Sequence, residues 1–369
     1  MKAIQWIISA LVAVVIIAAA VGGGVYFTRL KSIHSIRKLT DYENYNLYRM
    51  DIDYAYDLDR LIDRGITDNQ SMINAILAEA LPYLPIHMKA PNFGCSAFCT
   101  QGTDGHTLMG RNYDFKNDTS AMLVYCTPKD GYASVAFAAL DNINANTPDA
   151  SMAKKLATLT APFICLDGMN EKGVSIAVLT LDSDPTYQQT GKPMIATTLA
   201  IRLVLDRAAT TAEAVELLSK YDMFASSGRD YHFYITDASG DGRVLEYDCN
   251  DLARPLTVTP SRSVTNFFVM YKDNVLPNQR NGVYGHGRER YDAIEEILDA
   301  NAGSIDREIA WQALQAASQA PNPKDVTSNT QWSILYDNTA LTAEAVIRRD
   351  WNTKTSYNLV SNVAVTDVG

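Results

Sequence analysis

The sequence predicts an α+β fold, in which strands, then helices, then strands again follow an N-terminal transmembrane helix and a partly helical leader. Three observations predict it. Residues 3–27 carry no charged side chain, residues 72–81 present one apolar helical face, and residues 107–348 hold strand-like runs on both sides of a helical middle. Strands grouped before and after the helices of a domain are typical of α+β layers.

The apolar run at residues 3–27 is long enough for a membrane span, since about 20 apolar residues cross the hydrocarbon core as a helix. A cleaved signal peptide is the alternative, with Lys2 before the run and Ala18-Ala19-Ala20 near a cleavage point. The length of the run favours a retained anchor over residues 1–30.

A leader over residues 31–94 follows this anchor. Residues 41–64 are dense in Tyr, Asp and Arg, and residues 72–81 form the apolar helical face. Thr67 and Gln70 are placed as a capping box, and Pro82 and Pro85 stop the helix. The leader is either a membrane-proximal stalk with a docking helix or a propeptide that is removed by cleavage at Gly94-Cys95.

From Cys95 onward the pattern predicts one domain, residues 95–369. We expect strands at 107–115, 122–126, 133–140, 163–166, 173–181, 331–337 and 343–348, and a hairpin at 231–247. We expect helices at 197–220, broken near 208–209, and at 290–298 and 305–318. The hairpin turns lie at 167–173 and 238–242.

Composition limits the possible partners. The 369 residues are 47% hydrophobic, which suffices for one large core or two smaller ones. The formal net charge of −10, with no Lys/Arg stripe outside the first forty residues, argues against nucleic acid. The five cysteines show no disulfide framework, and the five histidines lack zinc-site spacing, so we expect no metal and no cofactor.

Cys95 is the most informative residue, because it lies sixteen positions before Arg111 in the motif Gly110-Arg111-Asn112-Tyr113-Asp114. A thiol attacks as the thiolate, so it needs a nearby cation and a base. Arg111 and Asp114 are candidates to supply these surroundings. Cys99 fits the spacing poorly and is expected in the core.

These residues resemble the start of the mature chain in the choloylglycine hydrolase family, which includes bile salt hydrolases and penicillin V acylases. The resemblance extends over nearly all of Cys95 to the C-terminus and over none of residues 1–90. Its further motifs are Thr103-Asp104-Gly105, Asp167-Gly168-Met169-Asn170-Glu171-Lys172-Gly173, His232 to Gly240, Thr265-Asn266, Arg290-Tyr291 and Trp332 to Tyr336. If the leader is a propeptide, its cleavage at Gly94-Cys95 frees the nucleophile as in the leader-bearing relatives that resemble acid ceramidase and isopenicillin acyltransferase.

The resemblance implies the four-layer αββα sandwich of the N-terminal-nucleophile hydrolases. In that scheme cleavage at Gly94-Cys95 frees the α-amino group of Cys95, which acts as the base. An α-amine has a reference pKa of about 7.7 to 8.0, which suits this task near neutral pH.

Roles follow from the resemblance for each matched residue. Cys95 attacks the amide carbonyl and forms a thioester, Arg111 favours the thiolate, and Asp114 accepts a hydrogen bond from the amine. Asn266 donates to the oxyanion. Arg290 supports the Cys95 pocket, although Arg288 is an alternative, since the two point to different faces of a helix.

One position departs from the family. Ten residues after Asn170, bile salt hydrolases place an Asn and penicillin acylases often a Tyr, and this chain has Thr180. We therefore expect Thr180 in the substrate site, a backbone amide as the second oxyanion donor, and a substrate other than a bile salt.

The family implies a small-molecule acyl-amide substrate with an apolar acyl group. Hydrolysis and acyl transfer use the same residues, so both stay open, as does an unprocessed membrane-tethered binding or sensor protein. The basic residues after the span would keep the domain in the cytoplasm by the positive-inside rule. The resemblance and the usual behaviour of N-terminal anchors favour an extracytoplasmic domain on a single membrane anchor.

Overall fold

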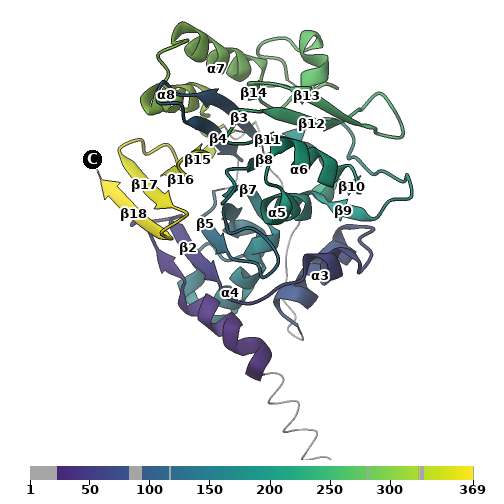
Figure 1. Ribbon diagram of the computed structural model, residues 1–369, viewed down its shortest axis with the longest axis vertical. Helices are drawn as coiled ribbons and strands as arrows, with labels where there is room; N and C mark the ends of the chain where they lie inside the picture. The colour runs from purple at the N-terminus through teal and green to yellow at the C-terminus, as the bar shows by residue number, and fades with distance from the viewer. Residues whose placement is uncertain are drawn as a thin grey trace, which may run out of the picture.

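The computed structural model describes residues 23–82, 94–115, 118–280, 282–322, 324 and 328–368 (Figure 1). The predicted span at residues 3–27 lies outside this part except for its last five residues, and Pro85 lies outside it entirely. Within the described ranges, no helix combines the length and the apolar character that a membrane crossing requires.

Two antiparallel-rich sheets form the centre of the described structure. The first has nine strands there, in the order β1 (Arg37–Lys38), β2 (Leu47–Ile52), β5 (Ala121–Cys126), β6 (Ser134–Ala139), β7 (Cys165–Asn170), β8 (Ser175–Leu181), β11 (Asp230–Thr236), β12 (Arg243–Tyr247) and β13 (Leu256–Pro260). The second has seven, in the order β14 (Ser263–Val264), β3 (Gly94–Gln101), β4 (Thr107–Asp114), β15 (Thr330–Asp337), β16 (Thr342–Ile347), β17 (Thr353–Asn358) and β18 (Val363–Val368).

Helices cover the outer faces of these sheets. Figure 1 shows α7 (Arg288–Ala300) and α8 (Arg307–Ala317) beside β3 and β4, with α5 (Thr197–Arg207) and α6 (Thr211–Leu218) on the side of β7 and β8. Further helices are α2 (Leu58–Ile62), α3 (Asn69–Ala80) and α4 (Met152–Ala157), and β9 (Met194–Ala196) and β10 (Asp222–Phe224) form a short parallel pair. The predicted α+β class is confirmed, with its layers in the order helix, sheet, sheet, helix.

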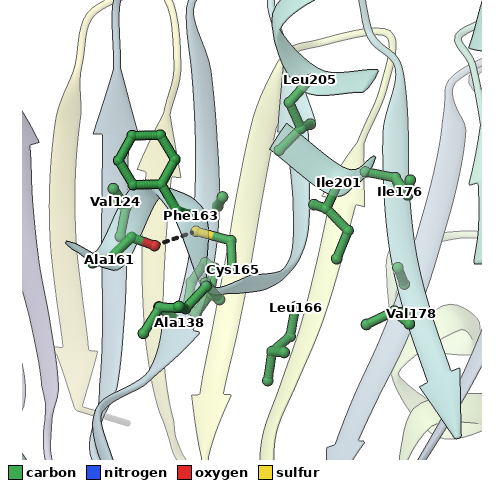
Figure 2. Packing of buried hydrophobic residues seen from close by; sticks show 14 of the residues in the cluster. Val124, Ala138, Ala161, Phe163, Cys165, Leu166, Ile176, Val178, Ile201 and Leu205 are labelled. Atoms are coloured by element: carbon green, nitrogen blue, oxygen red, sulfur yellow. Dashed lines mark hydrogen bonds between the residues drawn. The ribbon is translucent and has the colours of Figure 1, made fainter. Parts of the chain in front are cut away.

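Each helical layer packs through apolar side chains. Figure 2 shows Ile201 and Leu205 of α5 beside Ile176 and Val178 of β8, in the cluster that also holds Cys165. On the opposite side, Trp311 of α8 and the α7 leucine at position 298 pack on the second sheet. The burial of these side chains supplies the main force that holds helices on sheets.

Most predicted elements after residue 95 are present. The helix expected at 197–220 divides into α5 and α6, and Thr210 caps α6 by accepting from the Glu213 amide at 3.1 Å. The 231–247 hairpin is present as β11 and β12. Strands β17 and β18 were not predicted, because their alternating threonines and polar residues carry a weak apolar signal.

Two local predictions were wrong. The capping box of α3 is formed by Asp68 and Ser71, one residue later than expected. The turn expected to start at Asp167 starts after Asn170, because β7 continues through Gly168. A Cβ there would lie 2.7 Å from the Val135 carbonyl oxygen, so the glycine allows close strand packing.

The leader shares a sheet with the domain that follows it. β2 pairs in parallel with β5 over six residues, and its Leu47 and Met50 are buried in the main core. Arg29, on a helix over residues 23–34, donates to the Glu79 and Ala80 carbonyl oxygens at the end of α3. The leader is thus part of the packed structure, and its predicted removal as a propeptide stays untested.

We predict that cutting the chain between Pro82 and Gly94 leaves the two pieces associated, because β2 lies inside the nine-stranded sheet. A recognition sequence for a specific protease, inserted there in a Cys95→Ala chain with a C-terminal tag, allows the cut on demand in detergent. The leader piece should remain with the tagged piece on a size-exclusion column and separate in denaturant. As a control, Met50→Asp should weaken this association. Separation of the leader piece from the tagged piece under native conditions, in the chain without that substitution, would contradict the prediction.

Candidate active site

Cys95 is the second residue of β3. The β3–β4 hairpin brings it close to the residues of β4 from Arg111 to Asp114. The hairpin turns at Thr103-Asp104-Gly105, where Gly105 has a φ of +81°. Its register pairs Cys95 with Tyr113 and Gly94 with Asp114. The spacing between Cys95 and Arg111 in the sequence is therefore explained by a tight hairpin.

The Cys95 thiol is fully buried beside Arg111. Burial raises the pKa of Cys95 to about 11, and the Arg111 guanidinium, which hydrogen-bonds to the thiol, opposes that rise. In the continuous chain the thiol is consequently protonated near neutral pH. The predicted contact of Arg111 with Cys95 is present.

Arg111 is held by a buried carboxylate that sequence reasoning missed. Its Nε donates to Asp167 Oδ2 at 3.0 Å, and its Nη2 donates to the Val178 carbonyl oxygen at 3.1 Å. Asp167 also accepts from Trp332 Nε1 at 3.1 Å and from the Tyr336 hydroxyl at 2.6 Å. The signal was the Asp that opens the 167–173 motif, which was interpreted only as a turn residue.

Asp114 lies at the end of β4 with its carboxylate fully engaged. It accepts from Gln319 Nε2 at 2.9 Å, Thr330 Oγ1 at 2.6 Å and Arg290 Nη1 at 3.3 Å. Burial raises the pKa of Asp114, and the Arg290 guanidinium opposes that rise. Its backbone amide, rather than its carboxylate, is directed at the Cys95 sulfur.

Asn266 contacts the backbone nitrogen of Cys95. The Cys95 N–H donates to Asn266 Oδ1 at 3.1 Å, and Asn266 Nδ2 donates to the Thr180 carbonyl oxygen at 2.8 Å. Asn266 follows directly on β14 and Thr265, and β14 pairs with β3. The nitrogen that would become the α-amine after cleavage thus faces the Asn266 amide oxygen, where Asp114 had been expected.

Arg290, and not Arg288, faces Cys95. Arg290 donates to the Cys95 carbonyl oxygen at 2.9 Å and to Asn266 Oδ1 at 2.6 Å, whereas Arg288 donates to Asp292 at 2.8 Å, away from the site. Gly287 precedes α7 with a φ of +88°, and a Cβ there would meet Arg290 Nη2 at 2.4 Å. Glycine therefore makes room for the guanidinium.

Thr180 lies in β8, where its carbonyl is bound by Asn266. The side chain is buried, and its hydroxyl has no hydrogen-bond partner within the described ranges. The N–H and C=O of one strand residue point to the same side of the strand, so the Thr180 amide faces the side of Asn266.

Cys99 lies away from these residues. Its backbone N–H donates to the Arg262 carbonyl oxygen at 2.8 Å, and burial raises its thiol pKa to about 12. Over the described ranges, the His, Cys, Asp and Glu residues form no group of three or more that could hold a metal ion.

Solved structures share this fold. An Arg-to-Leu variant of the conjugated bile acid hydrolase from Clostridium perfringens has a TM-score of 0.54 at 16% identity, covering 74% of this chain and 97% of that one. A Cys-to-Ala mutant of the same hydrolase has the same score and identity, covering 74% and 96%. Penicillin V acylase from Agrobacterium tumefaciens has a TM-score of 0.51 at 17% identity, covering 71% and 85%.

The layers and these structures define the fold class as a four-layer α+β sandwich. Residues 95–254 match the model of the family described as linear amide C-N hydrolases, choloylglycine hydrolase family. This match to a family of amide hydrolases begins at Cys95. Asn266 and Arg290 lie outside it and reach Cys95 only through the fold.

We predict that Asp167→Asn lowers the free energy of unfolding by about 3 to 5 kcal/mol, because it leaves the buried Arg111 charge without its anionic partner. Urea unfolding followed by tryptophan fluorescence measures the change. The matched control is Glu216→Gln, which breaks an exposed pair with Lys220 and should cost less than about 1 kcal/mol. Equal small effects would show that Arg111 does not depend on Asp167.

Proposed function

We propose that this chain is a cysteine amidase of the N-terminal-nucleophile type, which hydrolyses linear C–N amides through a Cys95 thioester after self-cleavage at Gly94-Cys95. One observation carries the proposal. Asn266 accepts from the backbone N–H of Cys95, Arg290 donates to its backbone C=O, and Arg290 also donates to Asp114. Such contacts suit a residue whose backbone nitrogen takes part in the reaction.

Self-cleavage supplies the base that the continuous chain lacks. In this step the Cys95 sulfur attacks the Gly94 carbonyl carbon, the Gly94–Cys95 C–N bond breaks, and the thiol proton passes to the departing nitrogen. Water then hydrolyses the thioester, which leaves Gly94 as a carboxylic acid and restores the Cys95 thiol. The new α-amine, with an ordinary pKa of about 7.7 to 8.0, remains beside Asn266 Oδ1. The α-amine can then accept the thiol proton. In the continuous chain the thiol keeps this proton, because its pKa is about 11.

Substrate cleavage uses the same groups. The sulfur attacks the substrate carbonyl carbon as its proton passes to the α-amine, and the negative charge collects on the carbonyl oxygen. Asn266 Nδ2, which has a second N–H, and the Thr180 amide are the proposed donors to this oxyanion. Collapse breaks the C–N bond, and the departing amine receives the proton.

The thioester is released by water, which gives its proton to the α-amine while the acyl group leaves as the acid. An amine in place of water makes the enzyme an acyltransferase with the same residues. The two related structures of the Clostridium perfringens hydrolase alter a cysteine and an arginine sixteen positions apart, the spacing of Cys95 and Arg111. This match in spacing supports the roles of the pair.

The proposed substrates are small acyl amides with an apolar acyl half. The hydrolase from Clostridium perfringens acts on conjugated bile acids by its name, and the Agrobacterium enzyme on penicillin V. Thr180 is shorter than the Asn or Tyr at this position in the relatives, and its buried hydroxyl has no partner in the described part of the chain. We propose that the substrate site therefore differs in shape from theirs. Fatty N-acyl amides and acylated amino acids are therefore the first candidates.

The domain is proposed to be extracytoplasmic and held by a single anchor at residues 3–27. The Arg29 contacts to α3 support a fixed connection between that segment and the domain. An uncut sensor protein is the second candidate, and the buried, protonated thiol of the continuous chain is the observation that favours it.

We predict that the purified protein carries a new N-terminus at Cys95, measured by intact mass and N-terminal sequencing. Cys95→Ala should stay uncut, because it lacks the attacking sulfur. The matched control is Cys99→Ala, which removes a buried thiol four residues along the same strand and should be cut normally. A full-length wild-type chain that is nonetheless active would exclude the self-cleavage mechanism.

We predict that Asn266→Ala lowers kcat by roughly a hundredfold to a thousandfold, since it removes an oxyanion donor. KM should change much less, because the contact strengthens in the transition state. Steady-state release of the amine from a series of N-acyl amides measures both constants. If kcat were unchanged while KM rose, Asn266 would have a binding role only.

A further inference from the structure

His232 contacts the residue before Asn266 and does not take part in any step of the proposed reaction. It is fully buried in β11, opposite Glu246 of β12, one position beyond the pairing of Phe233 with Leu245. Its Nδ1 lies 3.0 Å from Glu246 Oε1, and its Nε2 lies 2.9 Å from the Thr265 carbonyl oxygen. Both ring nitrogens therefore face oxygen acceptors.

The hydrogen-bond partners determine the charge of this pair. A carbonyl oxygen can only accept, so Nε2 must carry a hydrogen. Both oxygens of Glu246 accept a backbone N–H. The Val269 N–H donates to Oε1, and the Met270 N–H donates to Oε2 at 3.0 Å. An ionised Glu246 accepts all three of these contacts, and it then requires a hydrogen on Nδ1 as well, which makes His232 an imidazolium.

The pair holds the chain on both sides of Asn266. His232 binds the carbonyl of Thr265, the residue before Asn266, while Glu246 binds the amides of Val269 and Met270, three and four residues after it. The Thr265 hydroxyl also donates to the Gly287 carbonyl oxygen at 2.9 Å, which ties this segment to the start of α7. Asn266 itself is thereby fixed between two held points.

We infer that His232 and Glu246 are positioning residues, a buried imidazolium–carboxylate pair that sets the Asn266 amide against Cys95 and the oxyanion. They touch neither substrate nor sulfur. The inference rests on the proposed function for its catalytic consequence, but the charge state and the fixed segment do not depend on activity. A charged pair suits this task, because removing either member leaves an unpaired buried charge that the segment must move to satisfy.

The first test reads the charge state by ¹⁵N NMR of histidine-labelled full-length Cys95→Ala protein in detergent. His232 should show two protonated ring nitrogens at neutral pH, and its signals are assigned by their loss in a His232→Gln variant. A neutral ring, with one unprotonated nitrogen, would overturn the inference. The charge state is read in protein whose His232 and Glu246 are unchanged, and the His232→Gln variant serves only for assignment.

The second test reads position through kinetics. Glu246→Gln in otherwise wild-type protein should lower kcat about tenfold to a hundredfold with KM within about twofold, because misplaced catalytic groups slow the chemical step. Glu246→Asp, which keeps the charge, should recover part of that loss. The matched control is His106→Gln, which removes a histidine–carboxylate contact with Asp337 elsewhere and should leave kcat unchanged.

These outcomes separate the two proposals. An inactive wild-type chain whose His232 is doubly protonated would count against the proposed function and leave the charged pair standing. An active enzyme whose kcat is unchanged in a folded Glu246→Gln variant would overturn the positioning role. An equal loss in Glu246→Gln and His106→Gln would also overturn it, by showing a general effect on stability.

Discussion

The ion pair of Arg111 and Asp167 joins the two sheets at a point that water does not reach. Arg111 belongs to β4 of one sheet and Asp167 to β7 of the other, and both are fully buried. A charge in such a place must be paired, so the position of the cation beside Cys95 depends on this contact, and Trp332 and Tyr336 donate to the same carboxylate. The same contact serves the packing and the proposed chemistry.

Contacts from α7 also fix the surroundings of Cys95. Arg290 reaches the Cys95 carbonyl, Asp114 and Asn266 from the first turn of α7, and Gly287 leaves the space it needs. Behind Asn266, the His232–Glu246 pair holds the segment from Thr265 to Met270. The candidate site is thus supported by two charged groups, one on each side of the Asn266 amide, and neither is placed by the hairpin that carries Cys95.

The leader adds an edge to this architecture. Since β2 is hydrogen-bonded to β5 and buries Leu47 and Met50, it contributes to the same core as the strands behind the site. A cut at Gly94-Cys95 would therefore change the chemistry at Cys95 without removing the leader. Arg29, which closes the end of α3, connects the residues after the predicted anchor to this packed unit.

The sequence by itself determined the α+β class and the division of α5 from α6, because these depend on local patterns. It also indicated the hairpin from Cys95 to Asp114, whose residues lie at fixed spacing within one motif. It could not determine that Asp167 binds Arg111, that Arg290 rather than Arg288 faces Cys95, or that the Cys95 N–H meets Asn266 rather than Asp114. These contacts join residues far apart in the chain, across two sheets and a helix start. Only the tertiary structure decided them, since burial and charge pairing act between neighbours in space and leave no period in the sequence.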